Sequence, residues 1–567
     1  MPDTKSNRTP RVPASGASVN DNGVAQLEGH PGAVPGWSGS GATPYELLLH
    51  RARFLTLDPA LPEAGALLIR DGRIAAVGSL AEVQAQAAGN AERRDLGGAV
   101  VTPGLNDAHI HVWKVGQLRT TSLDLRGLND LDELYRRVSE RAAALEPGEW
   151  LVGRGWNEAR LGGHGPTRAG LNTAAPQNPV LLTRTCAHIH AVNSPALEAA
   201  RITPATSAPG GGEIDYDGGL LYETAFGLLT RHMPTPDGAQ YERWIAAGLA
   251  YLAGLGLTGV TDPAIDPPLY AAYRALDARR ALPIRVNLLY MRRPDGGAET
   301  YPLPEKYVSD MLRCDSVKFF TDGGLSGATA ALGVEYRNTP QPTRGFLRFE
   351  TAELYRLAQE AHTAGFRIGA HAIGDRALDQ LLDVYERLER EHPTGMRHRI
   401  EHFGLPSAEH LARAAGLGVH AVPQAIFLHE LRGNFERYLP PEYLPRTYPL
   451  RAMLDAGLNL ALSSDGPVVQ EVRPLAGLQA AVQQPMVAGQ QITGHEALRA
   501  YTLGGALAQG DQNNRGTLEV GKWADLSVLS ADPLTHPVPG EIAVLGSYVG
   551  GTALPAALFP LPQGVPS

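Results

Sequence analysis

The chain is poor in cysteine and has neither a long apolar run nor a concentrated basic stretch. Two cysteines in 567 residues give no disulfide framework and fit a reducing compartment. No stretch of about 18 consecutive apolar residues is present, so no membrane-spanning helix is expected. The net charge of −9 and the lack of a basic cluster argue against nucleic-acid binding. The N-terminus shows no apolar signal-peptide segment, and together these features predict a cytoplasmic protein.

The two ends of the chain differ in composition and in hydrophobic pattern from the α/β segment between them. Residues 1–43 are rich in Gly, Pro, Ser, Asn and Ala without hydrophobic periodicity, which predicts a disordered tail. Short apolar runs follow in residues 44–100, where Asp71-Gly72 is a hairpin-turn signal. Similar runs recur in residues 516–555. Two distant all-β segments that flank one α/β body predict a small β-sandwich domain built from both termini.

Between residues 101 and 515, short apolar runs alternate with helical stretches, which is the pattern of parallel βαβ units. Helical spacing is clear at 350–365, which ends in the C-cap glycine Gly365, and at 376–392. The long segment 114–255, with one extra strand candidate at 178–186, is predicted to be an insertion after the first strand. Eight runs fit the strands of a TIM-like (β/α)8 barrel: 101–111, 256–262, 284–290, 316–322, 366–372, 397–403, 418–424 and 459–465.

The first of these runs, VTPGLNDAHIH, places His109 and His111 at its exit. Side chains two residues apart in a strand point to the same face, so both imidazoles leave on one side. Two neutral nitrogen ligands on rigid backbone are what a metal site needs. A pair of surface histidines is the competing interpretation, because an H-x-H triplet alone is weak evidence.

Further candidate ligands lie at or near the carboxyl ends of the fourth, fifth, sixth and eighth predicted strands: Lys318, His371, His402 and Asp465. Each also has an ordinary interpretation. Lys318 could be a buried lysine paired with Asp322 or Glu401. The two histidines could be satisfied core residues, and Asp465 could be a turn residue or a helix N-cap. A barrel brings these strand ends to one mouth, so their joint occurrence favours a shared site.

The chain resembles the amidohydrolase superfamily of metal-dependent hydrolases, in which the order HxH, Lys, His, His, Asp recurs on these same strands. The short sequence motifs around these residues are similar to those of the amidohydrolase-3 (YtcJ-like) branch, which includes N-substituted formamide deformylases. The resemblance spans roughly residues 45–555. The segments that carry it are VTPGLNDAHIH, RGWNEARLGG, LLTRTCAHIHAVNSPALE, GLTGVTD, VKFFTDGGLSGATA, AHAIGDRA, RIEHF, SSDGP and GTLEVGKWADLSVL.

The resemblance implies a site for two metals. His109 and His111 would bind the more buried metal, and His371 and His402 the second. Lys318, carboxylated on its amine by CO₂, would bridge the two, because a protonated lysine has no lone pair to donate. Asp465 would contact the first metal and act as general base and then acid in hydrolysis of an amide-like C–N bond. Zinc suits this ligand set, although other divalent metals would also fit.

The resemblance implies less about the substrate, which we expect to be a small amide-like molecule. Trp156, His188 and Glu223 match positions that would wall or contact the substrate pocket. Arg376 would neutralise Asp375 or reach the substrate, and for all four residues a structural role is equally open. The branch allows a homodimer, but no interface is visible in the sequence.

Three alternatives stay open on the sequence alone. A deaminase of the same superfamily would carry an HxxE pattern, but His371 is followed by Ala372, Ile373 and Gly374. A lactone or carbonate-ester hydrolase would use nearly the same site. A non-catalytic metal-binding scaffold is the third alternative, against which the full set of six ligands argues.

Overall fold

The computed structural model describes residues 46–158, 160–185, 189–209, 212–223, 225–294, 299–339, 341–484 and 486–559. The predicted tail, residues 1–43, and the candidate residue His188 lie outside the described residues. The side chain of Glu223 is likewise not described. No helix within the described part of the chain has the length and hydropathy that a bilayer crossing requires.

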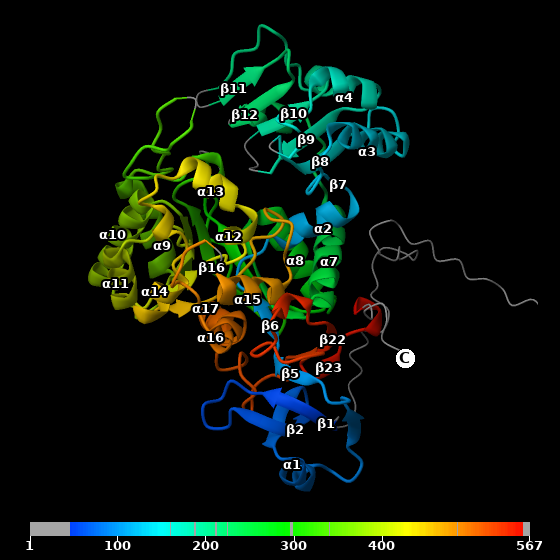
Figure 1. The fold of residues 1–567 in the computed structure, drawn as a ribbon, viewed down its shortest axis with the longest axis vertical. Helices are drawn as coiled ribbons and strands as arrows, with labels where there is room; N and C mark the ends of the chain where they lie inside the picture. The colour runs from blue at the N-terminus through cyan, green and yellow to red at the C-terminus, as the bar shows by residue number, and fades with distance from the viewer. Residues whose placement is uncertain are drawn as a thin grey trace, which may run out of the picture. The chain divides into compact units, whose positions relative to one another are not determined.

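An eight-stranded parallel sheet forms the centre of the α/β body, and the predicted TIM-like fold is confirmed (Figure 1). All eight predicted strands are present in the expected neighbour order. Beyond the two edge strands, Ala108 N–H donates to Leu462 O (3.2 Å) and Asp465 N–H donates to His109 O (2.8 Å). These bonds bring the first and last strands of the sheet together at one mouth. The strands are β6 (Leu105–Asp107), β13 (Leu257–Ile265), β14 (Arg285–Met291), β16 (Leu312–Phe320), β17 (Arg367–Ala372), β18 (Arg399–His402), β19 (His420–Val422) and β20 (Asn459–Leu460), with β15 (Tyr307–Val308) antiparallel to β16.

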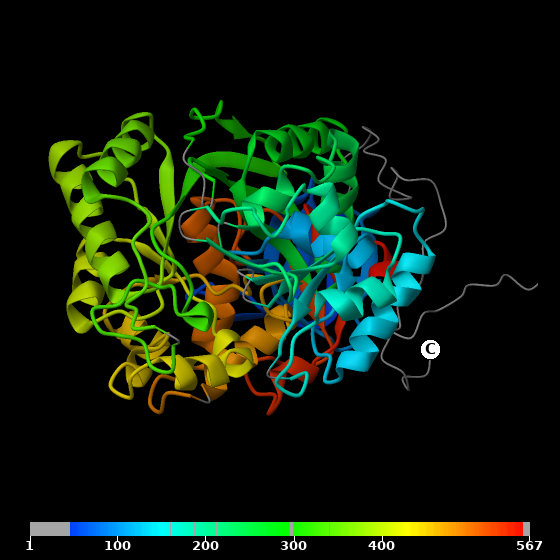
Figure 2. The same cartoon turned by 90° about the horizontal axis from the view of Figure 1, so that it is seen from above.

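Helices on the outside of this sheet bury one apolar face each. Both predicted helices are confirmed, as α9 (Thr351–Thr363) and α10 (Asp375–Glu391), and they lie outside the strands in both views (Figures 1 and 2). The chain leaves α9 through Gly365 at a φ of +76°, as expected for a C-cap glycine. The other helices that follow barrel strands are α8 (Pro267–Ala278), α11 (Ala408–Gly416), α12 (Phe427–Glu430), α13 (Arg432–Tyr438), α14 (Leu450–Asp455), α15 (Pro474–Gln483), α16 (Gly494–Arg499) and α17 (Gly505–Gln509).

The predicted opening strand is divided between two sheets. Its first part, β5 (Val100–Pro103), pairs with strands from both termini, and only the second part, β6, belongs to the barrel. Gly104 separates the two parts. A Cβ atom at Gly104 would lie 2.0 Å from Thr258 Oγ1, so only glycine lets the chain pass this close to β13.

The expected unit from both termini is a separate mixed sheet. Its strand order is β23-β22-β21-β5-β1-β2-β3, with β4 paired to β1. The predicted hairpin turn is confirmed, since Asp71 and Gly72 both have positive φ angles, as a type I′ turn requires. The bounds are β1 (Glu46–Leu55), β2 (Glu63–Arg70), β3 (Arg73–Gly78), α1 (Leu80–Gln86), β4 (Glu92–Asp95), β21 (Leu526–Leu529), β22 (Val544–Val549) and β23 (Thr552–Ala553).

The segment after the first barrel strand contains a third sheet with its own core. The strand order is β11-β12-β10-β9-β8-β7, and the extra strand predicted at 178–186 is β9 (Val180–Arg184) near its middle. Helix α2 (Val112–Thr120) leads into this segment and α7 (Gly238–Gly254) leads out of it. The two helices touch through glycines, because a Cβ at Gly116 would lie 1.7 Å from Trp244 O. The remaining elements are β7 (Leu123–Asp124), α3 (Leu131–Ala143), β8 (Leu151–Trp156), α4 (Arg168–Ala174), β10 (Ile189–Val192), α5 (Ser194–Ala199), β11 (Gly212–Asp215), β12 (Leu220–Glu223) and α6 (Phe226–Thr230).

Candidate metal centre

Three buried side chains at the barrel mouth have the geometry of a metal site. His109 and His111 follow β6, and Asp465 lies on the loop after β20. Asp465 Oδ1 is 3.6 Å from His109 Nε2 and 3.3 Å from His111 Nε2. One ligand atom from each of the three residues lies within 4.8 Å of the others. The spacing allows one divalent ion to contact all three.

The loops that carry these ligands are tied together by Asp107. Its Oδ1 accepts hydrogen bonds from the backbone N–H groups of His109 (3.0 Å) and Ser464 (3.2 Å). Asp107 is almost fully buried, and this burial raises its pKa to about 7. The same carboxyl group therefore fixes the first and last strand ends relative to each other.

A fully buried ion pair orients His109. Glu401 Oε2 lies 2.6 Å from His109 Nδ1, and Arg399 donates to Glu401 Oε1 (2.6 Å) and Oε2 (2.9 Å). With its Nδ1 held by a carboxylate, His109 presents Nε2 to the mouth. Sequence reasoning missed this role. The signal was the position of Glu401 on β18, directly before the predicted ligand His402.

His402 and His371 extend the cluster. The ring centre of His402 lies 4.9 Å from that of His109 and 4.4 Å from that of His371. Gln424 Oε1 holds His402 Nδ1 at 2.7 Å, which leaves Nε2 free for a ligand. The carbonyl of Gly323 holds His371 Nε2 at 3.0 Å, which leaves Nδ1 free. Each ring therefore presents one nitrogen that is not held by these partners.

Lys318 enters the same region from β16 with its amine buried. Its side chain is 1% exposed, and Nζ has no hydrogen-bond partner within the described residues. The amine forms no hydrogen bond with either carboxylate that the sequence suggested as its partner, Asp322 or Glu401. Asp322 accepts from the backbone N–H groups of Ile373 and Gly374, and Glu401 is held by Arg399. Burial lowers the pKa of Lys318 to about 8.

The charge states suit metal ligation. Burial lowers the pKa of His111 and His402 to about 4, that of His371 to about 3, and that of His109 well below its usual value. All four rings are therefore neutral at pH 7, as metal binding requires. Burial alone would raise the pKa of Asp465. The contact with His111 and the other nearby histidines have the larger, opposite effect and keep this pKa below its usual range.

The orphaned polar atoms in this cluster also fit a metal. Asp465 Oδ1 and Lys318 Nζ are buried, and neither has a hydrogen-bond partner in the part of the chain described here. Buried polar atoms are normally paired, so such a concentration calls for an explanation. A cation would satisfy the carboxylate directly. The amine would need to become a carbamate first, because an ammonium group cannot ligate a cation.

The described surroundings of the substrate-side candidates do not include the metal ligands. Trp156 is buried in the core of the third sheet, where its indole N–H donates to Leu182 O (2.8 Å). Arg376 is exposed in the first turn of α10, and the carboxylate of Asp375 lies 3.7 Å from Arg446 Nη2 instead. His188 and the Glu223 side chain lie outside the described part of the chain. The substrate roles of these residues stay predictions.

Comparisons with known proteins agree with this geometry. A model described as the amidohydrolase family matches residues 92–554. An N-substituted formamide deformylase from Arthrobacter pascens is 31% identical, over 89% of this chain and 97% of its own. The putative amidohydrolase YtcJ of Bacillus subtilis is 30% identical, over 82% of this chain and 91% of its own. The crystal structure of an uncharacterized metal-dependent hydrolase from Pyrococcus horikoshii has a TM-score of 0.74 and 26% identity, over 88% of this chain and 99% of that one.

Proposed function

Since the chain belongs to the amidohydrolase family, we propose that it hydrolyses the C–N bond of a small amide, in particular an N-formyl or other N-acyl amine. The observation that carries this proposal is the convergence of His109, His111 and Asp465 at one barrel mouth. The relative named as an N-substituted formamide deformylase supports the substrate class. The bond would be a carbon–nitrogen bond other than a peptide bond.

We assign six side chains to the binding of two divalent metals, most simply zinc. His109, His111 and Asp465 would hold one metal, and His371 and His402 the other. Lys318, once carboxylated, would bridge them. The reaction consumes the neutral amine and CO₂ and releases one proton, and a pKa near 8 keeps part of the amine neutral at pH 7. When bound, such metals would polarise the scissile carbonyl and lower the pKa of the attacking water.

Asp465 would carry the proton during turnover. Its carboxylate is ionised at neutral pH and its Oδ1 is free of hydrogen bonds within the described residues, so it can accept a proton from the attacking water. Delivery of that proton to the leaving nitrogen completes the cycle, because an amine anion is a poor leaving group. His111 Nε2 lies 3.3 Å from Asp465 Oδ1, a separation that one metal ion bound to both atoms would span.

Alternative reactions at the same site differ in the bond that is cleaved. A deaminase would attack an aromatic amidine carbon, and a lactonase would cleave a C–O bond. The lack of an HxxE pattern after His371 and the presence of Lys318 both favour the amide reaction with two metals. The two-cysteine composition supports a reducing compartment such as the cytoplasm.

Metal content per chain is the first test, on protein purified with zinc and bicarbonate. We expect about two zinc ions in the wild type and fewer in Lys318→Ala, because the bridging ligand is lost. Lys306→Ala is a matched control, since Lys306 is exposed and its amine donates to the carbonyl of Gly365. Wild-type protein is then assayed on N-formyl amines, N-acyl amines, lactones and aminated aromatic rings, with and without a chelator.

Chelator-sensitive release of an amine from N-formyl or N-acyl substrates would support the proposal. About one zinc per chain, unchanged in Lys318→Ala, would contradict the proposed site with two metals bridged by Lys318. The deaminase substrates would then be tested next. A fully loaded protein that turns over nothing in the panel would instead favour a non-catalytic metal-binding scaffold.

A further inference from the structure

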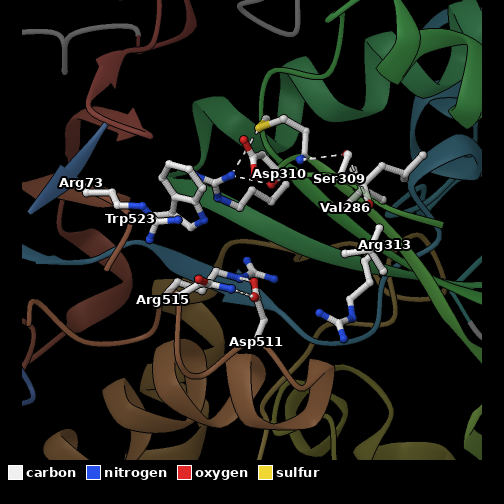
Figure 3. A pocket seen from close by; sticks show the side chains of 13 residues that line it. Arg73, Val286, Ser309, Asp310, Arg313, Asp511, Arg515 and Trp523 are labelled. Atoms are coloured by element: carbon white, nitrogen blue, oxygen red, sulfur yellow. Dashed lines mark hydrogen bonds and ion pairs between the residues drawn. The ribbon is translucent and has the colours of Figure 1, made fainter. Parts of the chain in front are cut away.

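A cavity lies at the opposite end of the barrel strands from the proposed metal ligands. It measures about 210 Å³ and is lined by the starts of β14 and β16 and by residues of the sheet from both termini (Figure 3). The lining carries four arginines against two carboxylates: Arg73, Arg285, Arg313 and Arg515 against Asp310 and Asp511. Typical pockets for drug-sized ligands are about 300–1,000 Å³, so this cavity suits only a small molecule.

Three of the arginines are neutralised by carboxylates. Arg285 bonds both oxygens of Asp525 (2.7 and 2.9 Å), and Arg515 bonds Asp511 (2.7 Å). The third, Arg313, bonds a carboxylate on its own strand at 2.6 Å. These three residues line the cavity with their charges balanced, and further acceptors hold some of their remaining N–H groups.

Arg73 differs from the other three. Its guanidinium lies 3.8 Å from the ring centre of Trp523, and the two side chains lie side by side at one end of the cavity (Figure 3). Within the described residues its only hydrogen bond is from Nη1 to Gly521 O (2.8 Å), and it forms no ion pair. Stacking fixes the plane of a guanidinium and leaves the N–H groups at its edge available to an acceptor.

We propose that this cavity binds a small oxyanion, with Arg73 as its principal ligand. A carboxylate or phosphate group matches the fork of N–H donors that a guanidinium presents. Arg285, 4.7 Å from the ring centre of the same Trp523, lies on the other side of the indole, and Asp525 already balances its charge, so Arg73 supplies the uncompensated charge. The ligand is a small metabolite or ion that bears such a group, because the volume admits little more.

The site joins two parts of the fold. Arg73 begins β3 of the terminal sheet, whereas Arg313 lies on β16 of the barrel. An anion that contacts residues of both sheets binds the folded protein and not the unfolded chain. Occupancy should therefore raise the unfolding temperature in proportion to the logarithm of the anion concentration.

The test uses the full-length, metal-loaded protein with sodium phosphate and sodium succinate as probes, each matched in ionic strength by sodium chloride. Binding is measured by calorimetry and by the shift in unfolding temperature. Arg73→Gln removes the charge, and we expect its dissociation constant to rise about tenfold to hundredfold. Arg51→Gln is the matched control, because Arg51 is an exposed arginine of the same sheet with one surface ion pair.

The control also separates this site from the metal centre, where the same anions can bind. An anion held by the metals would bind wild type, Arg73→Gln and Arg51→Gln equally, and that result would overturn the proposal. Equal weakening in both arginine variants would overturn it too, since it would reflect general charge. Selective weakening in Arg73→Gln supports it, and the probe that binds more tightly identifies phosphate or carboxylate as the group recognised.

Discussion

Glu401 Oε2 lies 2.6 Å from His109 Nδ1, and this contact determines which nitrogen of His109 faces the metal site. The carboxylate is itself held by Arg399, which also donates to Ala108 O (2.7 Å), one residue before the histidine. One ion pair thus supports both the side chain and the backbone of a single ligand. The ion pair is shielded from bulk solvent, because both of its side chains are fully buried.

Replacement of Glu401 by Gln should weaken metal binding by about 10- to 100-fold, the usual cost of losing a carboxylate behind a ligating histidine. It should also lower the free energy of unfolding by about 3–5 kcal/mol, because Arg399 would be left buried without its counter-ion. Metal affinity is measured by competition with a chelator, below the unfolding temperature of the variant. Glu409→Gln, at an exposed position on α11, should retain wild-type affinity. A wild-type affinity in Glu401→Gln would show that the contact does not govern the ligand.

Replacement of Asp465 by Asn tests the proton carrier. The amide cannot accept the proton of the attacking water, and general acid–base catalysis contributes about 10²- to 10⁴-fold, so turnover should fall by that factor. Much of the metal should remain, because His109 and His111 are unchanged. Metal analysis and initial rates are measured on the same preparation. Near-normal turnover at full metal content would reassign the proton transfer to another group.

The barrel was predictable because its strands have strong local signals. Each of the eight runs is rich in apolar residues, and five of them carry a potential metal ligand at or near the carboxyl end. Parallel strands bring those ends together whatever their distance in sequence. His109 and Asp465 are 356 positions apart in number, yet both could be assigned to one mouth from the strand order alone.

Residues that act through a neighbour could not be assigned in the same way. Glu401 and Gln424 look like ordinary strand-end polar residues, and only the packed structure shows that each holds the Nδ1 of a histidine. The division of the opening strand at Gly104 was missed because it depends on Thr258, which is distant in sequence. The local pattern of β5 and β6 is that of one continuous strand.

Replacement of Trp156 by Ala distinguishes a structural role from a substrate-binding one. Loss of a buried tryptophan costs about 3–5 kcal/mol, and Trp156 packs in a core with Leu171 and Leu182, so we expect the third sheet to lose stability. The expected readout is faster proteolysis within residues 121–237. Trp156→Phe keeps much of the apolar contact but loses the hydrogen bond to Leu182 O. A raised KM in Trp156→Phe, with unchanged protease resistance, would instead place the side chain at the substrate.

Replacement of Asp262 by Asn should change how stability depends on pH. Asp262 is fully buried within β13, and burial raises its pKa to about 7 although Tyr273 donates a hydrogen bond to Oδ2 (2.6 Å). The folded protein therefore holds this proton up to about pH 7, whereas the unfolded chain releases it near the usual value of 3.8. The free energy of unfolding that this group contributes is fully present below pH 3.8, the pKa in the unfolded chain. It is lost as the pH rises towards 7, the pKa in the folded protein.

The amide side chain in Asp262→Asn would not titrate, but its carbonyl would still accept from Tyr273. The free energy of unfolding of the wild type should therefore fall, relative to that of Asp262→Asn, by up to about 4 kcal/mol between pH 4 and pH 8. Urea unfolding of both proteins, metal-loaded and in matched buffers, measures this difference, and contributions from histidines and from the metal cancel because both proteins share them. If the free energies of unfolding of the two proteins changed in parallel between pH 4 and pH 8, Asp262 would already be ionised in the folded state. A cation such as Lys114 would then compensate its burial.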